Sequence, residues 1–227
     1  MGGTGGAAPA TPTLTQPNLN QGLLLQPVLI LFAHPALHKS RVNRVLIEGV
    51  RDLPGVTFHD LYESYPEFDI DVRREQQLLL DHEIIVFQHP FFWYSTPAIL
   101  KEWQDLVLEH GWAYGHEGTA LRGKTFLNAI TTGGREVAYQ REGHNRFTIQ
   151  ELLAPLEQTA RLCGMEVLPP FVAHGTHGMS EEDIGRHARE WHRIVEALRD
   201  ERLDREAARS QTRLNASPDA VIREGGP

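Results

Sequence analysis

Four consecutive aromatic residues are the first candidates for ligand binding: Phe91-Phe92-Trp93-Tyr94. They follow an apolar run at 84–87, which predicts a buried strand, and precede an amphipathic run from Pro97, which predicts a helix. Neighbouring side chains on irregular backbone cannot all point inward, so some of these rings must line a surface cleft. The stretch predicts a slot for a flat ring system. The alternative is that Trp93 and Tyr94 cover the sheet edge or form a subunit interface.

A second stretch pairs two hydroxyl residues with two glycines: Thr131-Thr132-Gly133-Gly134. Glycines let main-chain N–H groups approach a ligand closely. Fixed N–H dipoles would favour the negative charge that develops on the pyrimidine edge of a reduced flavin. Tyr139 and His144 follow, and a phenol and an imidazole there could hydrogen-bond a carbonyl and supply a proton. The alternative for both is an exposed loop position.

A third stretch predicts an anion site: Ser40-Arg41-Val42-Asn43, at the expected start of a helix. Free N–H groups and the positive end of the helix dipole bind anions at such a position. Ser40 and Asn43 add neutral donors, and His34 or Arg41 can add charge. This would be a phosphate pocket without a glycine-rich P-loop. The alternative is ordinary capping by Ser40, with His34 merely ending a strand.

Alternating strands and helices must position these three stretches. Apolar and alternating patterns predict strands at 28–33, 56–61, 84–88, 124–130 and 166–173, the last interrupted by Pro169-Pro170. Helical spacing predicts helices at 41–50, 72–82, 97–109, 147–162 and 180–199. The alternation predicts a three-layer α/β sandwich with parallel strands. The loops after the first, third and fourth strands then meet at the carboxyl edge of the sheet, where such folds bind ligands.

Length and composition favour one domain: the chain has 227 residues and is 41% hydrophobic. Residues 1–26 carry no charged side chain and are predicted to be a disordered tail. Residues 27–200 form the predicted domain, and residues 201–227 are expected to extend the last helix and fade into disorder. The longest apolar stretches have strand length, so no membrane span is predicted.

Charge and residue usage exclude several functions. A net charge of −8 without a basic cluster argues against nucleic-acid binding. The single cysteine, Cys163, excludes an internal disulfide and fits a reducing cytosol. Neither His34 and His38 nor His174 and His177 has a nearby cysteine or an obvious carboxylate partner, so no metal site is predicted. No Gly-x-Ser-x-Gly elbow of a serine hydrolase occurs.

Separated motifs occurring in order resemble a known family. Ala33-His34-Pro35 with Ser40 and Asn43, Gln88-His89-Pro90 through Trp93-Tyr94 to Lys101, and the Thr131 to Gly134 stretch resemble the flavodoxin-like NAD(P)H:quinone oxidoreductases. Within them, Gly111-Trp112-Ala113-Tyr114-Gly115 and Leu168-Pro169-Pro170-Phe171 are most similar to the ancillary oxidoreductase subunits of bacterial glutathione-regulated potassium-efflux systems. The resemblance covers about residues 27 to 200.

The resemblance implies a flavodoxin-like sandwich whose five-stranded sheet has the order 2-1-3-4-5, with helices on both faces. It implies a homodimer with non-covalent flavin, FMN rather than FAD. Matching positions would hold the flavin phosphate (His34, Ser40, Arg41, Val42, Asn43), its ring system (Phe91, Phe92, Trp93, Tyr94) and its pyrimidine edge (Thr131, Thr132, Gly133, Gly134). Tyr139 and His144 would be the catalytic pair that assists hydride transfer.

The expected activity is two-electron transfer from NAD(P)H through FMN to a quinone, in alternating half-reactions. The alternative is a non-catalytic, flavin-binding regulatory subunit of a membrane potassium/proton antiporter. The chain has no basic patch that would bind lipid, so a protein partner would have to bring it to the membrane. We therefore expect a cytoplasmic protein, peripheral to the inner face of the cell membrane if a channel subunit recruits it.

Overall fold

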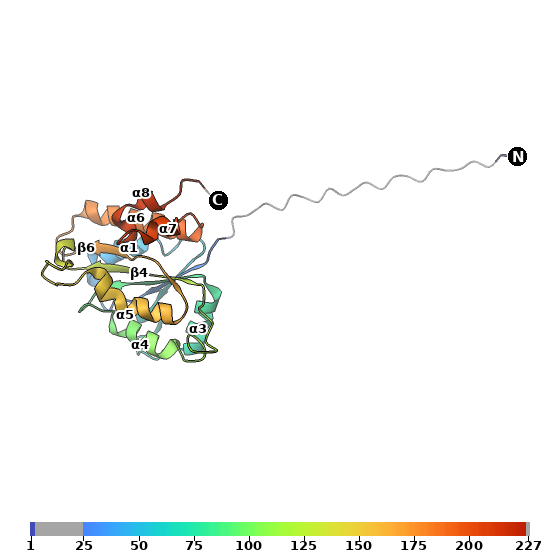
Figure 1. Cartoon of the computed structure of the whole chain (residues 1–227), viewed down its shortest axis with the longest axis horizontal. Helices are drawn as coiled ribbons and strands as arrows, with labels where there is room; N and C mark the ends of the chain where they lie inside the picture. Colours follow the sequence, from blue (N-terminus) through green and yellow to red (C-terminus); the bar gives the residue numbers. More distant parts are fainter. Residues whose placement is uncertain (3–24, 226–227) are drawn as a thin grey trace.

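A computed structural model describes residues 1–2 and 25–225, and it is built around one parallel sheet (Figure 1). The predicted N-terminal tail, residues 1–26, lies largely outside the described residues. The strand order β2-β1-β3-β4-β5 is the predicted one, and β6 also pairs with β4. The strands are β1 (Val28–Phe32), β2 (Val56–Asp60), β3 (Ile84–Pro90), β4 (Thr125–Thr132), β5 (Glu166–Val167) and β6 (Phe171–His174).

Burial explains which strands lie at the centre. Every residue of β1, β3 and β4 is buried, as expected for continuous apolar runs covered on both faces. The fifth strand position is divided: β5 pairs with one end of β4 and β6 with the other. Pro169 and Pro170 lie between them and have no N–H to donate to the sheet. The predicted interruption of the fifth strand is thus confirmed.

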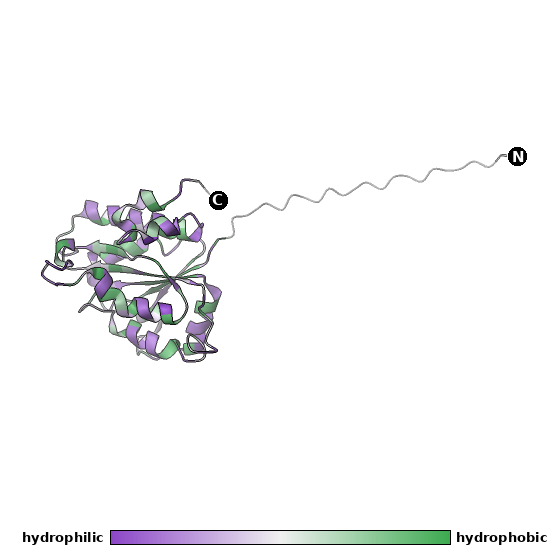
Figure 2. Ribbon diagram, viewed as in Figure 1, coloured by the Kyte–Doolittle hydropathy of each residue, from purple (hydrophilic) through white to green (hydrophobic). Residues whose placement is uncertain are grey.

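Helices cover both faces of the sheet (Figure 1). One face carries α1 (Arg41–Glu48) and α6 (Glu181–Arg199); the other carries α3 (Val72–Asp81), α4 (Ala98–Val107) and α5 (Ile149–Leu162). Shorter turns are η1 (Leu37–Lys39), α2 (Leu61–Ser64) and η2 (Glu136–Ala138). In Figure 2 the strands are mainly hydrophobic and the outer helix faces hydrophilic. No helix in residues 25–225 is long and apolar enough to cross a membrane.

Local capping sets where the helices begin. Ser40 accepts the N–H of Asn43 at the start of α1, which is the capping stated above as the alternative role of Ser40, and Ser180 accepts the N–H of Asp183 at the start of α6. Pro97, expected at the first helical position, is instead the N-cap of α4. Strand β3 runs two residues beyond its predicted end, because its pairing with β4 continues to Pro90.

The C-terminal segment corrects a prediction. Residues 201–225 do not fade into disorder; they form α7 (Arg205–Arg209), η3 (Leu214–Ala216) and α8 (Pro218–Val221). Helix α6 ends at Arg199 and the chain reverses at Glu201, whose φ is 55°. Leu203, Leu214 and Val221 are buried in the same apolar cluster as α6. These three apolar residues are widely spaced among charged ones, so the sequence pattern did not indicate that they would be buried.

A buried carboxylate joins three elements on the opposite face. Glu75 of α3 has no exposed surface and accepts hydrogen bonds from Tyr65 Oη at 2.6 Å and Trp103 Nε1 at 2.8 Å. Its third partner is His59 Nε2 of β2, also at 2.8 Å. Burial would raise the pKa of Glu75, but these hydrogen bonds and the charge of His59 outweigh burial and hold the pKa below its ordinary value. The carboxylate therefore fixes α3 against β2 and α4.

Candidate functional site

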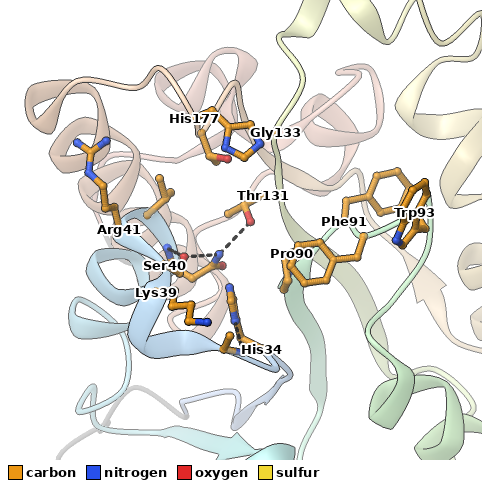
Figure 3. Close-up of a pocket in the computed structure, with 15 residues that line it drawn as sticks. His34, Lys39, Ser40, Arg41, Pro90, Phe91, Trp93, Thr131, Gly133 and His177 are labelled. Atoms are coloured by element: carbon orange, nitrogen blue, oxygen red, sulfur yellow. Dashed lines mark hydrogen bonds between the residues drawn. The ribbon is translucent and has the colours of Figure 1, made fainter.

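A cavity of about 580 Å³ lies at the carboxyl edge of the sheet, where the three predicted loops meet (Figure 3). Its volume falls within the range of about 300–1,000 Å³ typical of ligand sites. The loop after β6 adds a fourth wall. The lining residues are His34, Ala36, Lys39, Ser40, Arg41, Val42, Asn43, Pro90, Phe91, Phe92, Trp93, Thr131, Gly133, Thr176 and His177.

The first wall is the start of α1. Ser40 Oγ accepts the N–H of Asn43 at 3.1 Å, and the buried Asn43 donates through Nδ2 to Ser40 Oγ and to Thr131 Oγ1, at 3.1 and 3.0 Å. These bonds lock the helix start to the end of β4. The N–H groups of Arg41 and Val42 belong to the first turn, where no helical carbonyl can accept them. Both residues line the cavity, so the wall suits an anion.

His34 contributes a neutral donor to the same wall. Its Nδ1 accepts the N–H of Ala36 at 3.1 Å, so the neutral ring carries its proton on Nε2. Burial lowers the pKa of His34 and favours this neutral form. The ring meets Phe92 edge-on, with centroids 5.9 Å apart. The first loop and the aromatic loop therefore touch across the cavity.

The charge of the lining is opposite to that of the whole chain. Lys39 and Arg41 line the cavity, and among the residues that the structure describes its lining includes no carboxylate, although the chain has a net charge of −8. Arg41 also pairs with Glu181 at the exposed surface, which offsets part of its charge. This lining fits a phosphate group better than a neutral ligand.

The aromatic loop forms the second wall. Phe91 is buried and its N–H donates to Thr131 O at 2.8 Å, whereas Trp93 is 93% exposed. Trp93 and Tyr94 adopt left-handed backbone, with φ of 50° and 62°. Phe91, Phe92 and Trp93 line the cavity. Tyr94 does not line it, because its hydroxyl turns away and donates to Asn145 Oδ1 at 3.2 Å.

The third wall comes from alternate residues of the Thr-Thr-Gly-Gly stretch. Thr131 and Gly133 line the cavity, but Thr132 and Gly134 do not, because β4 continues to Thr132 and neighbouring strand residues face opposite sides. Thr132 Oγ1 instead donates to Gly134 O at 2.9 Å. A Cβ on Gly133 would lie 2.6 Å from His177 Nε2. Only a residue without a side chain therefore allows the imidazole of His177 to pack against the main chain at this position.

The two residues predicted to assist hydride transfer are not placed alike. Tyr139 lies against Gly134, whose added Cβ would be 3.1 Å from Tyr139 Cε2, and lines a neighbouring cavity of about 180 Å³ with His174. Burial raises the pKa of Tyr139, so at neutral pH its phenol is a donor. His144 is exposed and lines neither cavity. The structure therefore brings Tyr139, but not His144, next to the site.

Five residues of the lining were not predicted from the sequence: Ala36, Lys39, Pro90, Thr176 and His177. Thr176 and His177 follow β6, whose carboxyl end lies at the same sheet edge as the other loops, so the rule used for the first three loops would have found them. His177 was considered only as a metal ligand. Within residues 25–225, no group of three or more histidine, cysteine or acidic residues is arranged to hold a metal ion.

Comparison with known proteins identifies relatives of this chain. The chain is 49% identical over 173 residues to the uncharacterized NAD(P)H oxidoreductase YrkL of Bacillus subtilis, covering 76% of this chain and 98% of the relative. It is 47% identical over 168 residues to the glutathione-regulated potassium-efflux system ancillary protein KefG of Yersinia pestis, covering 73% and 92%.

A solved structure and a protein-family match point to the same relationship. General stress protein 14 of Treponema denticola, solved in complex with FMN, superposes with a TM-score of 0.72 at 37% identity, covering 75% of this chain and 98% of that one. The protein family described as having a flavodoxin-like fold matches residues 26–195. The resemblance found in the motifs is thus confirmed, and the chain belongs to this flavodoxin-like family.

Proposed function

We propose that the protein is an FMN-dependent NAD(P)H oxidoreductase whose electron acceptor is a quinone. One observation carries the proposal: the cavity joins an anion site without carboxylates, at the start of α1, to an aromatic wall at 91–93. Such a combination suits a ligand with a phosphate at one end and a flat ring at the other. The FMN complex of the Treponema relative and the NAD(P)H in the name of the Bacillus relative support the two cofactors.

The residues present fit FMN at both ends. The N–H groups of Arg41 and Val42, with Ser40 and His34, would hold the phosphate, and Phe91 to Trp93 would face the ring. Gly133 lines the cavity without a side chain, and His177 occupies the space that a Cβ there would take. Bound FMN would supply the hydride chemistry, taking two electrons from NAD(P)H and giving them to an acceptor.

The remaining task of the protein is orientation and proton supply. Trp93 is almost fully exposed and can contact a second planar molecule entering the cavity mouth. Tyr139, a neutral phenol beside Gly134, can donate a hydrogen bond to a carbonyl there. We propose Tyr139 for this role, and His144 only if its exposed loop moves toward the cavity.

The test of the proposed function begins with an absorbance spectrum of the purified protein. We expect the bands of oxidised flavin, and FMN rather than FAD after acid release and chromatography. Stopped-flow mixing with NADH or NADPH should bleach those bands, and a soluble quinone should restore them. Bound flavin that neither nicotinamide reduces, or reduced protein that no quinone reoxidises, would refute the oxidoreductase.

Removing the Trp93 side chain should weaken FMN binding or slow reduction by NAD(P)H about tenfold, roughly 1.4 kcal/mol, because an aromatic contact of this kind is lost. The fold should survive because Trp93 is exposed. Fluorescence titration with FMN and the reduction rate measure the effect for Trp93→Ala. Phe68→Ala is the matched control, since Phe68 is also an exposed aromatic with a positive φ but does not line the cavity. Equal FMN affinities and reduction rates for the two variants would mean that the aromatic loop only covers the sheet edge and does not contact the flavin.

A regulatory subunit is the second candidate function, favoured by the 47% identity to KefG. In this proposal, flavin occupancy changes contacts with a membrane potassium-efflux protein, and turnover is incidental. Co-purification with such a protein from the same organism, and ion flux that changes when the chain is added, would support it. Flux that responds equally to protein with and without flavin would argue against it.

We also propose a homodimer, as the family resemblance implies. Exposed Trp93 and Tyr94 at the cavity mouth are suited to an interface with a second copy. Light scattering after gel filtration should give twice the chain mass of 25.6 kDa. A single-chain mass at micromolar concentration would exclude a stable dimer.

A further inference from the structure

The C-terminal segment at residues 201–225 lies beyond the part of the chain that the family model matches. The family match ends at residue 195, and the aligned part of this chain already accounts for nearly all of the Bacillus relative. The segment nevertheless belongs to the fold, because Leu203, Leu214 and Val221 are buried in the core cluster beside α6. It is therefore a folded part of the protein beyond the residues that the family model matches.

This segment covers the free edge of β6. The N–H of Leu214 donates to Pro170 O at 2.9 Å. The amide of Asn215 bonds both main-chain groups of Val172: Oδ1 accepts the N–H and Nδ2 donates to the carbonyl, each at 3.0 Å. One side chain thus takes the place of a neighbouring strand. These bonds hold residue 213 beside the strand that ends at the site.

Arg213 then connects the segment to the loop that carries Tyr139. Its guanidinium pairs with Glu136 in η2, three residues before Tyr139. The hydrogen bond from Arg213 holds the pKa of Glu136 below its ordinary value. The same loop reaches the aromatic wall, because Asn145 donates its N–H to Ala138 O at 2.9 Å and accepts the Tyr94 hydroxyl. The ion pair therefore lies near the start of the loop at 135–147. This loop contacts Gly134 through Tyr139 and the aromatic loop through Asn145.

The segment also lines the cavity beside Tyr139. That cavity of about 180 Å³ is lined by Tyr139 and His174 together with Thr212 and Arg213 of the segment. Gln150 of α5 donates to Thr212 O at 2.6 Å and fixes the outer side. Tyr139 thus lies between Gly134 and a cavity that the C-terminal segment also lines.

We propose that Arg213 is a positioning residue for the reaction: through Glu136 it holds the loop at 135–147 so that Tyr139 stays beside the flavin cavity. This inference rests on the proposed oxidoreductase activity only for its kinetic consequence. The holding of the loop is a separate property. A family domain without the segment would have to hold Tyr139 by other contacts.

The experiment compares four variants of the full chain, of which Arg213→Lys is the conservative one. Arg213→Ala removes the pair from the segment, and Glu136→Gln weakens it from the exposed loop side without disturbing the packing of the segment. Arg223→Ala is the matched control, because Arg223 pairs with Asp204 inside the segment and does not touch the loop. Each variant is subjected to limited trypsin digestion and to steady-state kinetics with NAD(P)H and a soluble quinone. Cleavage is scored at Arg141 and Arg146, because the third site in the loop, Arg135, is directly followed by the residue that Glu136→Gln changes.

We expect Arg213→Ala and Glu136→Gln to be cleaved in the loop about fivefold faster than the parent, the modest size expected for a partly exposed ion pair. Their kcat/KM for the quinone should fall by a similar factor while FMN affinity stays within about twofold, and Arg213→Lys should recover most of the loss. Arg223→Ala should match the parent in every assay.

Loop cleavage and kcat/KM that match the Arg223→Ala control in both Arg213→Ala and Glu136→Gln would overturn the proposal. If Arg213→Ala fails to fold, Glu136→Gln decides alone, because Glu136 is exposed. A parent protein that shows no NAD(P)H oxidation would refute the proposed function, and the digestion rates would still decide whether Arg213 holds the loop.

Discussion

Replacing Ser40 with aspartate should lower the affinity for FMN by at least about 100-fold, close to 2.7 kcal/mol. Ser40 lines the cavity at the start of α1, where the phosphate is proposed to bind. Two unit charges about 4 Å apart repel by about 4 kcal/mol at an effective dielectric constant of 20, and the phosphate carries about 1.5 to 2 charges. Aspartate caps a helix as well as serine does, so the fold should keep its stability.

Ser40→Asn separates charge from shape. Asparagine is nearly isosteric with aspartate and is an equally good cap, so it should retain FMN binding within about tenfold of the parent. Fluorescence titration of the apoprotein with FMN gives both affinities, and thermal unfolding without FMN checks the fold. Similar FMN affinities for the two variants would mean that the phosphate does not bind at the start of α1.

The second large effect is expected far from the cavity. Glu75→Gln should reduce the free energy of unfolding by about 3 kcal/mol, or about 10 °C in melting temperature. The carboxylate accepts from Tyr65, Trp103 and His59, and an amide in its place presents a donor to at least one of these groups. Urea unfolding measures the loss. Glu102→Gln, on the exposed surface next to Trp103, is the control and should change stability by less than about 0.5 kcal/mol.

The same carboxylate predicts a pH dependence. The pKa of Glu75 is lower in the folded protein than its unfolded value of about 4.3. Its contribution to stability is therefore complete above that unfolded value and is lost as the pH falls through the folded pKa. Unfolding curves measured from pH 7 down to about pH 3.5 should show the difference between parent and Glu75→Gln shrinking in the acid range. A difference that is constant across this range would show that ionisation of Glu75 contributes nothing.

Much of the fold could be predicted because its central strands are buried on both faces. The runs at 28–33 and 84–87, which lie in β1 and β3, are apolar without interruption, a pattern typical of strands covered on both faces. The helix starts were visible for a local reason: Ser40 and Ser180 lie directly before helical spacing. The C-terminal segment has a capping residue, Asp204, but its apolar residues are too widely spaced to indicate a buried helix face. Leu203, Leu214 and Val221 are buried only because they pack against residues that are distant in the sequence.

The candidate site shows the same division. The three loops that follow predicted strands do meet in one cavity. Which residue of each loop faces it depended on details that the pattern did not contain. Strand β4 ends at Thr132 rather than 130, so Thr131 and Thr132 point to opposite sides. His177 reaches Gly133 from a segment more than forty residues away, and only the packed sheet brings them together.

The backbone of the aromatic loop has a consequence for how this protein could be changed. Trp93 and Tyr94 occupy left-handed conformations that cost a non-glycine residue about 1 kcal/mol or more each. Glycine adopts this conformation without that cost. The aromatic side chains at 93 and 94 are therefore present although they destabilise the local backbone conformation. Selection of variants for heat resistance alone should therefore favour Gly or Asn at 93 and 94. Variants selected in this way would gain thermal tolerance and lose Trp93 from the aromatic wall, so the selection would also need to require flavin binding.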